Sequence, residues 1–168
     1  MAVFALALGL DRDWFVPTTD KHCTDMFANY YPAVTEPAVP GQLRLGAHTD
    51  YGSLTVLYQD GTPGGLQVHR DGRWQDAPLV PGTFVVNIGD LMSRWTNDRW
   101  VSTLHRVQVP VQERWGVPRL SIPYFHQPND DAVIEAIPTC VDVDNPPRYA
   151  PITSGENLTY KTEGTFAG

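Results

Sequence analysis

Polar and apolar residues alternate along several short segments of the chain, and this alternation predicts β-strands. In residues 101–109, valine, threonine and histidine occupy one set of alternate positions, while serine, leucine, arginine and glutamine occupy the other. Because alternate side chains of a strand point to opposite faces of a sheet, His105 is expected on the inward, mostly apolar face. Further strands are predicted at residues 26–31, 53–59, 66–70, 73–77, 83–88, 119–125 and 132–137, and the strand 83–88 is expected to be buried.

Turn signals separate these predicted strands. They fall near residues 60, 71, 81 and 97, a spacing that is typical of a β-sandwich or jelly roll. Asp71 and Gly72 form a strong hairpin signal. Pro123 lacks a backbone donor, so it is expected to place the second half of its strand at a sheet edge or in a bulge.

Few segments predict helices. Residues 1–10 are apolar and are expected to form a helix that ends near Gly9, with its apolar surface packed on the domain. Residues 11–23 predict a loop or a second short helix, with Pro17 as a breaker. Asp90 is expected to cap a short helix that runs to about Thr96. A proline-rich loop is expected at 142–151, and the tail after Thr153 is expected to form a short helix or to fray.

These elements predict an all-β fold, a double-stranded β-helix (jelly roll) preceded by a short helix or two. The length of 168 residues suits one domain. Within it we expect a helical lead-in at 1–24, a β core at 25–137 and a C-terminal tail at 138–168.

Composition narrows the possible partners. The chain has 12 lysines and arginines against 19 aspartates and glutamates, a net charge of −7. Without clustered basic residues, a nucleic-acid partner is not expected. Residues 1–10 lack the basic start and cleavage site of a signal peptide and are too short to span a bilayer, so no membrane partner is expected either. Cys23 and Cys140 do not suggest a disulfide framework. A reducing cytoplasm is the default location, although pairing of the two cysteines stays open.

Two histidines and an aspartate form a candidate metal site. His48 and Asp50 are separated by one residue, so on an extended segment their side chains point to the same face. His105 would add a third ligand from its inward face. Two histidines and one carboxylate make a facial triad, which leaves open positions on a non-haem Fe(II). Each motif alone is weak evidence, because an isolated His-x-Asp or strand histidine is more often structural.

A second pair of polar residues suits a carboxylate. Arg119 and Ser121 are also two residues apart and share a face of their predicted strand. A guanidinium can bind a carboxylate through two parallel hydrogen bonds, and a hydroxyl beside it adds a donor. A buried arginine in an apolar strand is unfavourable without an anion. A dicarboxylate co-substrate would supply that anion and could chelate the iron with its other end.

Six motifs follow one another along the chain: Asn29-Tyr30-Tyr31-Pro32, His48-Thr49-Asp50, Gly65-Leu66-Gln67-Val68, Asn87-Ile88-Gly89-Asp90, Ser102-Thr103-Leu104-His105-Arg106-Val107 and Arg119-Leu120-Ser121. In this order they resemble the isopenicillin N synthase-like group of Fe(II)- and 2-oxoglutarate-dependent dioxygenases, and the resemblance extends from about Leu6 to Phe166. It implies that His48, Asp50 and His105 bind Fe(II). It also implies that Arg119 and Ser121 bind the C5 carboxylate of 2-oxoglutarate, and that Asn29 and Tyr31 contact the same co-substrate.

The resemblance implies an oxygenase that uses O2 and couples oxidative decarboxylation of 2-oxoglutarate to hydroxylation, desaturation or ring closure of a small organic molecule. Two alternatives stay open. One is an oxidase that uses no 2-oxoglutarate and binds its substrate's own carboxylate with Arg119 and Ser121. The other is a truncated, non-catalytic jelly roll that binds a metal or ligand. Members of the group usually carry an N-terminal region that packs on the barrel. Because the chain lacks this region, it is expected to self-associate or to be marginally stable.

The remaining histidines and aromatic residues have simpler interpretations. No potential metal ligand lies at a characteristic sequence spacing from His22, His69 or His126. These histidines are therefore expected to be surface or core residues. Tyr58, Phe84 and Phe125 are weak candidates for lining the pocket.

Overall fold

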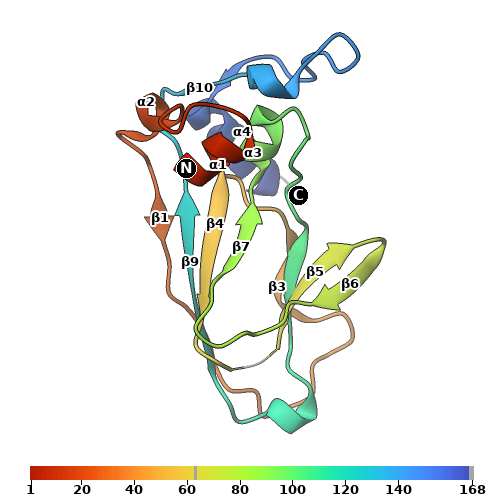
Figure 1. The fold of residues 1–168 in the computed structure, drawn as a ribbon. Coiled ribbons are helices and arrows are strands. Elements are labelled where there is room, and N and C mark those ends of the chain that lie inside the picture. The colour runs from red at the N-terminus through yellow and green to blue at the C-terminus, as the bar shows by residue number, and fades with distance from the viewer. Residues whose placement is uncertain (63, 167–168) are drawn as a thin grey trace.

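The computed structural model describes residues 1–62 and 64–166. Two antiparallel sheets face each other, and the helices gather at one end of them (Figure 1). The helices are α1 (Ala2–Ala7), α2 (Val16–Thr19), α3 (Asp90–Trp95) and α4 (Ser154–Phe166), with the short 3-10 turns η1 (Gln112–Arg114) and η2 (Pro138–Cys140). Within the described residues, no helix combines the length and the apolar character needed to cross a membrane.

The larger sheet is built around its longest strand, β9. It contains β1 (Asp25–Met26), β2 (Asn29–Tyr31), β4 (Leu54–Gln59), β7 (Val85–Ile88) and β9 (Arg119–His126). Strands β1 and β2 pair with one side of β9, β4 pairs with the other side, and β7 pairs with β4.

The smaller sheet has the order β3-β8-β5-β6. Its strands are β3 (Leu43–His48), β8 (His105–Gln108), β5 (Leu66–Arg70) and β6 (Arg73–Asp76). A separate short pair joins β10 (Val133–Ile134) to β11 (Ile152–Thr153). The predicted all-β jelly roll with short N-terminal helices is confirmed.

The turn chemistry matches the sequence at two sites. Asp71 and Gly72 have φ angles of 51° and 73° and connect β5 to β6 as a two-residue hairpin. Asn97 and Asp98 have φ angles of 53° and 65° and turn the chain after α3. Aspartate and asparagine tolerate this left-handed region better than most residues.

Pro123 lies in the middle of the sheet, so the expectation of a sheet edge or bulge is wrong. It pairs in register with Leu57 on β4. Its carbonyl accepts a hydrogen bond of 3.2 Å from the backbone N–H of Phe27, a residue between β1 and β2. In a strand, the N–H and C=O of one residue point to the same side. The missing donor of Pro123 therefore faces the break between β1 and β2, where the ladder is already interrupted.

Several predicted strands are shorter or more exposed than expected. Residues 26–31 form two short strands because of that break, and 132–137 contributes only β10. In the segment 101–109, only His105–Gln108 is a strand. The segment 83–88 is not buried, since Phe84 is 61% and Val86 56% exposed.

The helices also differ in detail from the sequence prediction. Helix α1 is confirmed, but only Ala5 and Leu8 of its region are fully buried, whereas Val3 and Leu6 are exposed. Pro17 lies in the first turn of α2 rather than ending a helix, and the φ of proline suits that position. The tail forms the 13-residue helix α4, the longest helix described, after the unexpected strand β11.

Asp90 is not a helix cap. Gly89 is the N-cap of α3, without a side-chain cap bond. Asp90 is the first helical residue, and its carboxylate contacts Thr49 and Lys161 instead. A Cβ at Gly89 would lie only 2.1 Å from the carbonyl oxygen of Gly52, so the close approach of these backbones requires glycine at this cap.

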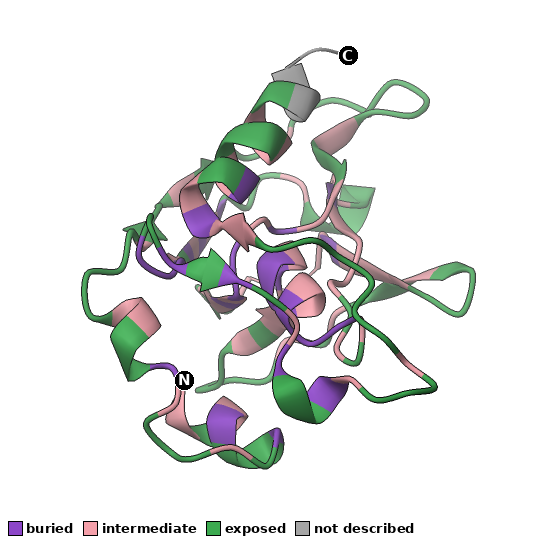
Figure 2. Ribbon diagram, turned by 90° about the horizontal axis from the view of Figure 1, so that it is seen from above, coloured by how far each residue is buried: buried purple, intermediate pink, exposed green. Residues whose placement is uncertain are grey.

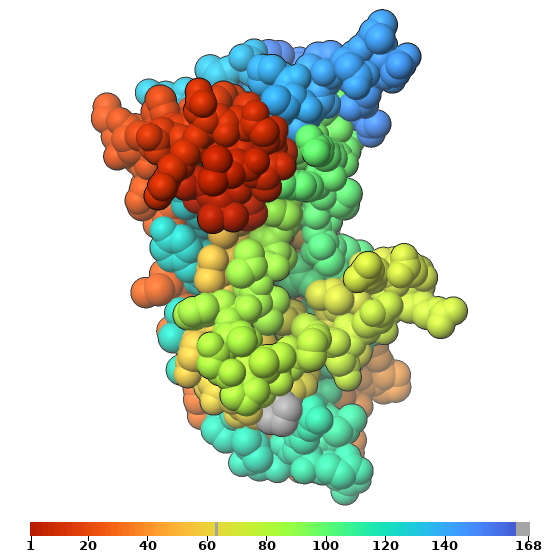
Figure 3. Space-filling view, viewed as in Figure 1, coloured from red at the N-terminus to blue at the C-terminus, as the bar shows by residue number. Residues whose placement is uncertain are grey.

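The apolar core lies at the helical end of the molecule. The N-terminal and C-terminal segments both lie at this end (Figure 3), and the view from above shows buried residues gathered within it (Figure 2). The core residues are Ala5, Leu8, Phe15, Leu91, Met92, Trp95, Ala132, Ile134, Ile137 and Cys140. The ring of Phe15 packs edge-on against that of Trp95, with centroids 5.0 Å apart.

The larger sheet has two contrasting faces. Its inner face carries Asn29, Thr55, Arg119 and Ser121, which point toward the smaller sheet. Its outer face carries a row of exposed apolar side chains that are in register or two residues apart across the strands. This outer patch consists of Met26, Tyr30, Tyr58, Phe84, Val86 and Tyr124.

Candidate active site

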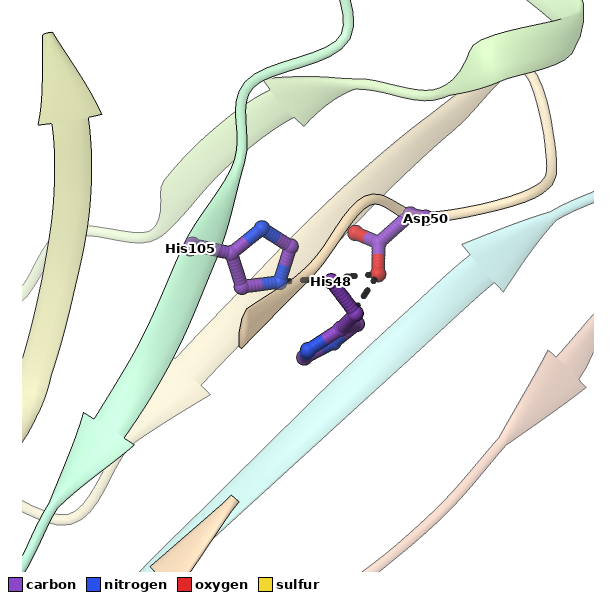
Figure 4. A group of neighbouring side chains, drawn as sticks. All are labelled: His48, Asp50 and His105. Atoms are coloured by element: carbon purple, nitrogen blue, oxygen red, sulfur yellow. Dashed lines mark ion pairs between the residues drawn. The ribbon is translucent and has the colours of Figure 1, made fainter. Parts of the chain in front are cut away.

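The two histidines and the aspartate converge at the mouth of the barrel. His48 ends β3, His105 begins β8 and the two residues are paired in register, while Asp50 lies in the loop that follows β3. The Oδ1 atom of Asp50 lies 3.8 Å from Nε2 of His48 and 3.6 Å from Nε2 of His105. One ligand atom from each residue falls within 4.8 Å of the other two, and Figure 4 shows the three side chains pointing toward one another.

Each histidine has its ring orientation fixed by its own backbone. Nδ1 of His48 lies 2.9 Å from the carbonyl oxygen of Gly46, and Nδ1 of His105 lies 2.8 Å from that of Thr103. A carbonyl oxygen can only accept, so both Nδ1 atoms must carry the proton. In the neutral rings the lone pairs are then on the Nε2 atoms, which face Asp50. This is the arrangement in which histidines bind a metal.

Asp50 has one oxygen held by the protein and one directed toward the histidines. Its Oδ2 accepts hydrogen bonds from Oγ1 of Thr55 (2.5 Å) and Nδ2 of Asn87 (2.7 Å). Thr55 and Asn87 are cross-strand partners on β4 and β7. Neither role was predicted from the sequence, although the alternation of β4 places Thr55 on the inner face. Two donors on Oδ2 leave Oδ1 to complete the ligand set.

The loop between the first two ligands is connected to α4. Asp90 Oδ2 accepts a hydrogen bond of 3.0 Å from Oγ1 of Thr49, which lies between His48 and Asp50. The same carboxylate oxygen lies 2.9 Å from Nζ of Lys161 on α4. The C-terminal helix is therefore linked, through α3, to the loop that carries Thr49 and Asp50. No local pattern in the sequence predicts this link.

Arg119 is buried, and some of its hydrogen-bond donors have no partner among the described residues. It is 4% exposed, and Ser121 beside it is 3% exposed. Nη2 of Arg119 donates to Oε1 of Gln59 at 3.0 Å, but Nε and Nη1 are buried without a partner among the described residues. Buried donors without partners are unfavourable and rare. These unpartnered donors lie on different edges of the guanidinium, and a carboxylate bound at either edge would satisfy one of them.

Arg119 has a second guanidinium, that of Arg44, as well as the carboxylate of Asp60 among its charged neighbours. Both guanidinium groups contact the ring of Tyr31, with Cζ of Arg119 5.1 Å and Cζ of Arg44 5.6 Å from its centroid. Burial and, after it, the nearby charge of Arg119 lower the pKa of Arg44 below its usual range. An anion bound here would offset this repulsion.

The predicted site residues line a single cavity between the two sheets. The triad lies at one part of it, and Asn29, Tyr31, Arg119 and Ser121 form another part. Apolar side chains complete the wall: Leu45, Leu57, Leu66, Val68, Val85, Val107, Pro123 and Phe125. Phe125 therefore lines the pocket as expected. Tyr58 and Phe84 do not, because they pack against each other (centroids 6.5 Å apart) in the outer patch.

The other histidines and the cysteines lie outside this cavity. His126 is buried and hydrogen-bonded through Nδ1 to Oγ of Ser53 at 2.6 Å. Burial, followed by the positive charges of the N-terminus and His22, lowers the pKa of His126 to about 4. His69 packs edge-on against Trp74. Cys23 is exposed and Cys140 is buried, and both are free thiols.

A jelly roll with a His-Asp-His triad and a buried arginine defines the class of non-haem iron oxygenases. The family model of the 2OG-Fe(II) oxygenase superfamily matches residues 23–128. The chain belongs to this superfamily.

One curated relative and two solved structures support this assignment over nearly the whole chain. The 2-oxoglutarate-Fe(II) type oxidoreductase hxnY of Emericella nidulans is 40% identical over 156 residues, which cover 91% of this chain and 43% of hxnY. A full-length Neurospora crassa protein solved with alpha-KG and thymine superimposes with a TM-score of 0.91 and 41% identity, covering 98% of this chain and 51% of that one. JOX2, solved with 2OG, Fe and JA, superimposes with a TM-score of 0.81 and is 32% identical. The match covers 97% of this chain and 46% of JOX2. The chain thus spans about half the length of these relatives.

Proposed function

We propose that this chain binds Fe(II) and 2-oxoglutarate and uses O2 to oxidise a C–H bond of a small organic molecule. The observation that carries the proposal is the shared cavity. A preorganised His-Asp-His ligand set and the unpartnered donors of Arg119 line the same space between the sheets. Co-substrate complexes of two relatives and the thymine complex of one of them support it.

The donor set fits the implied iron and co-substrate. Nε2 of His48, Nε2 of His105 and Oδ1 of Asp50 would hold Fe(II). Arg119 and Ser121 would bind the distal carboxylate of 2-oxoglutarate. Bound iron, with O2 and 2-oxoglutarate, supplies C–H oxidation coupled to oxidative decarboxylation. The protein orients the ligands through Thr55 and Asn87 and surrounds the cavity with apolar side chains that exclude water.

Two alternatives make different predictions. An oxidase that uses no 2-oxoglutarate would bind its substrate's carboxylate at Arg119, and a non-catalytic jelly roll would bind ligands without turnover. The relatives solved with alpha-KG or 2OG favour the oxygenase.

The test is an anaerobic titration of the purified chain with Fe(II) and 2-oxoglutarate, followed by exposure to air and measurement of succinate with a panel of small molecules. We expect one Fe(II), one 2-oxoglutarate and substrate-dependent succinate, all lost in His48→Ala. Binding of both without succinate under any condition would favour the non-catalytic alternative. Fe(II) binding without 2-oxoglutarate binding would favour the oxidase.

We also propose that the isolated chain self-associates through the outer patch, because soluble monomers rarely expose large contiguous apolar surfaces. Sedimentation velocity over a concentration series tests this. A sedimentation coefficient that stays monomeric throughout, and is unchanged in Phe84→Ser, would contradict it. We propose a cytoplasmic location from the two free thiols, and imaging of the tagged gene product would check it.

A further inference from the structure

A second cavity opens on the other side of the triad. It has a volume of about 350 Å³, and its walls come from the β1 region, the loop after β3, the end of β9 and helix α4. His48, Asp50 and Phe125 line both cavities. If the cavity at Arg119 takes 2-oxoglutarate, as the proposed function requires, the second cavity is where a substrate reaches the metal.

The second cavity differs from the first in charge. No lysine or arginine side chain is among its described lining residues, and apart from the metal ligands its charged group is the carboxylate of Asp25. Its apolar wall contains Phe27 and Phe125, whose rings meet edge to face with centroids 5.9 Å apart, together with Leu158 of α4. A neutral molecule with an apolar, flat body suits this surface better than an anion, because the wall away from the metal ligands carries the carboxylate of Asp25 and no lysine or arginine side chain among its described residues.

Gln127 lines the cavity with a polar side chain that no other described residue engages. The residue is only 8% exposed, and its backbone N–H donates to Oγ1 of Thr24. Its side-chain amide has no hydrogen-bond partner among the described residues. A Cβ at Gly52 would lie 3.1 Å from both Cδ and Nε2 of Gln127 and 2.5 Å from the carbonyl oxygen of His126. Glycine at position 52 therefore gives the amide the space that it occupies beside the ligand loop.

A carboxamide presents one acceptor and two donors in a plane. Because no group among the described residues competes for the amide, a ligand that pairs with both its oxygen and its nitrogen gains two hydrogen bonds. A ligand with an adjacent donor and acceptor of its own, such as an amide, lactam or imide, matches this pattern with two hydrogen bonds.

We propose that Gln127 determines substrate specificity, and that the second cavity binds a neutral, planar molecule through an amide, lactam or imide edge paired with the Gln127 carboxamide. The flat body of the molecule lies against Phe27, Phe125 and Leu158. The inference rests on the proposed function, because it assigns the first cavity to 2-oxoglutarate.

The test compares Gln127→Met, which keeps the length of the side chain and removes both polar atoms, with Gln75→Met, a matched change at an exposed position on β6. Each protein is loaded anaerobically with Fe(II) and 2-oxoglutarate and titrated calorimetrically with thymine, benzamide and benzoate. Benzamide and benzoate share a shape and differ in charge.

We expect the unaltered chain to bind thymine or benzamide at least about tenfold more tightly than benzoate. Gln127→Met should lose about tenfold or more of that affinity, the equivalent of two ordinary hydrogen bonds. Its 2-oxoglutarate affinity should stay within about twofold, and Gln75→Met should behave like the unaltered chain.

Three results would overturn the assignment of Gln127: equal affinity for benzoate, unchanged amide affinity in Gln127→Met, or no binding of any probe to the loaded, unaltered chain. In each of these cases the proposed function stands, because Fe(II) and 2-oxoglutarate are already bound. If the unaltered chain fails to bind Fe(II) and 2-oxoglutarate at all, the proposed function itself falls, and the inference falls with it.

Discussion

The interior of the barrel and the helical end of the molecule are built from different chemistry. Between the sheets, the inward side chains include the candidate metal ligands and the buried pair Arg119 and Ser121. The helical end holds the cluster of buried apolar side chains, of which Trp95 and Phe15 are the largest, beside buried polar residues such as Thr96 and Asn97. A barrel whose interior holds polar groups and open space cannot also serve as the main hydrophobic core. The apolar burial that stabilises the fold is therefore concentrated beside the site, at the helical end.

Helix α3 belongs to both regions. Leu91, Met92 and Trp95 are buried in the apolar core. At its first turn, the backbone N–H of Asp90 donates to the carbonyl oxygen of Asp50 at 2.7 Å. Stability and ligand geometry thus depend on different residues, which meet at this one helix. Substitutions in each region should therefore separate metal binding from folding.

The largest expected effect is the loss of Fe(II) binding when a ligand of the candidate metal site is removed. His105→Ala should abolish stoichiometric Fe(II) binding, because two remaining ligands do not make a facial triad. The thermal midpoint of the metal-free chain should change little, since His105 lies outside the apolar core. Fe(II) binding is measured anaerobically by equilibrium dialysis, with His69→Ala as the control. Retention of one tightly bound Fe(II) by His105→Ala would refute the ligand assignment.

In the apolar core, a substitution is expected to reduce stability without abolishing Fe(II) binding. Trp95→Ala should lower the free energy of unfolding by about 3–5 kcal/mol, the usual range for removing a large buried aromatic ring. Urea unfolding of the metal-free protein measures this change. The fraction that stays folded at low temperature should still bind one Fe(II). A loss of Fe(II) binding from fully folded Trp95→Ala would show that the two regions are not separable.

Acid should weaken the fold through His126. The pKa of this buried histidine is lowered to about 4 in the folded chain, against about 6.5 in an unfolded one. Below pH 6.5 the unfolded chain takes up a proton that the folded chain does not. The contribution of His126 is therefore complete above about pH 6.5. It is lost as the pH falls toward 4, by at most about 3 kcal/mol. Urea unfolding at a series of pH values should show a shallower decline in His126→Asn than in His69→Asn, and parallel curves would contradict this role.

A smaller effect is expected at the carboxylate site. Arg119→Lys keeps the charge but loses the planar pair of donors, so 2-oxoglutarate affinity should fall by about 1–3 kcal/mol. Calorimetry on the Fe(II)-loaded protein measures it, with Arg73→Lys at an exposed position as the control. Unchanged affinity would mean that Arg119 does not contact the co-substrate, and would favour the oxidase alternative.

The smallest effect is expected on the outer surface of α1. Leu6 is 61% exposed and covers little of the fold. Leu6→Asp should change the thermal stability of the chain by less than about 0.5 kcal/mol, whereas Leu8→Asp, at a fully buried position two residues away, should destabilise it severely. Comparable losses in both variants would mean that α1 packs differently from the structure described above.

Local periodicity was enough to predict the faces of the strands. The two-residue repeat placed His105 on the inner face of its strand and Arg119 and Ser121 on one shared face, and in the structure all three line one cavity with His48 and Asp50. The repeat is a property of the strand itself and needs no knowledge of its neighbours.

Long-range pairing was not predictable in the same way. Pro123 occurs in a central strand because a break between two other strands, about 95 residues earlier in the chain, faces it. The contact of Lys161 with Asp90 joins segments that no local pattern connects. Gln127 carries no motif, and its position became informative only when its neighbours in space were known.

The most direct test of the central claim is a crystal structure of the chain grown anaerobically with Fe(II) and 2-oxoglutarate, with anomalous data collected at the iron edge. We expect one anomalous peak within bonding distance of Nε2 of His48, Oδ1 of Asp50 and Nε2 of His105. We also expect the distal carboxylate of 2-oxoglutarate to accept a hydrogen bond from at least one of the unpartnered donors of Arg119, Nε or Nη1. An iron peak elsewhere, or a 2-oxoglutarate that leaves both Arg119 donors without a partner, would contradict the proposed function.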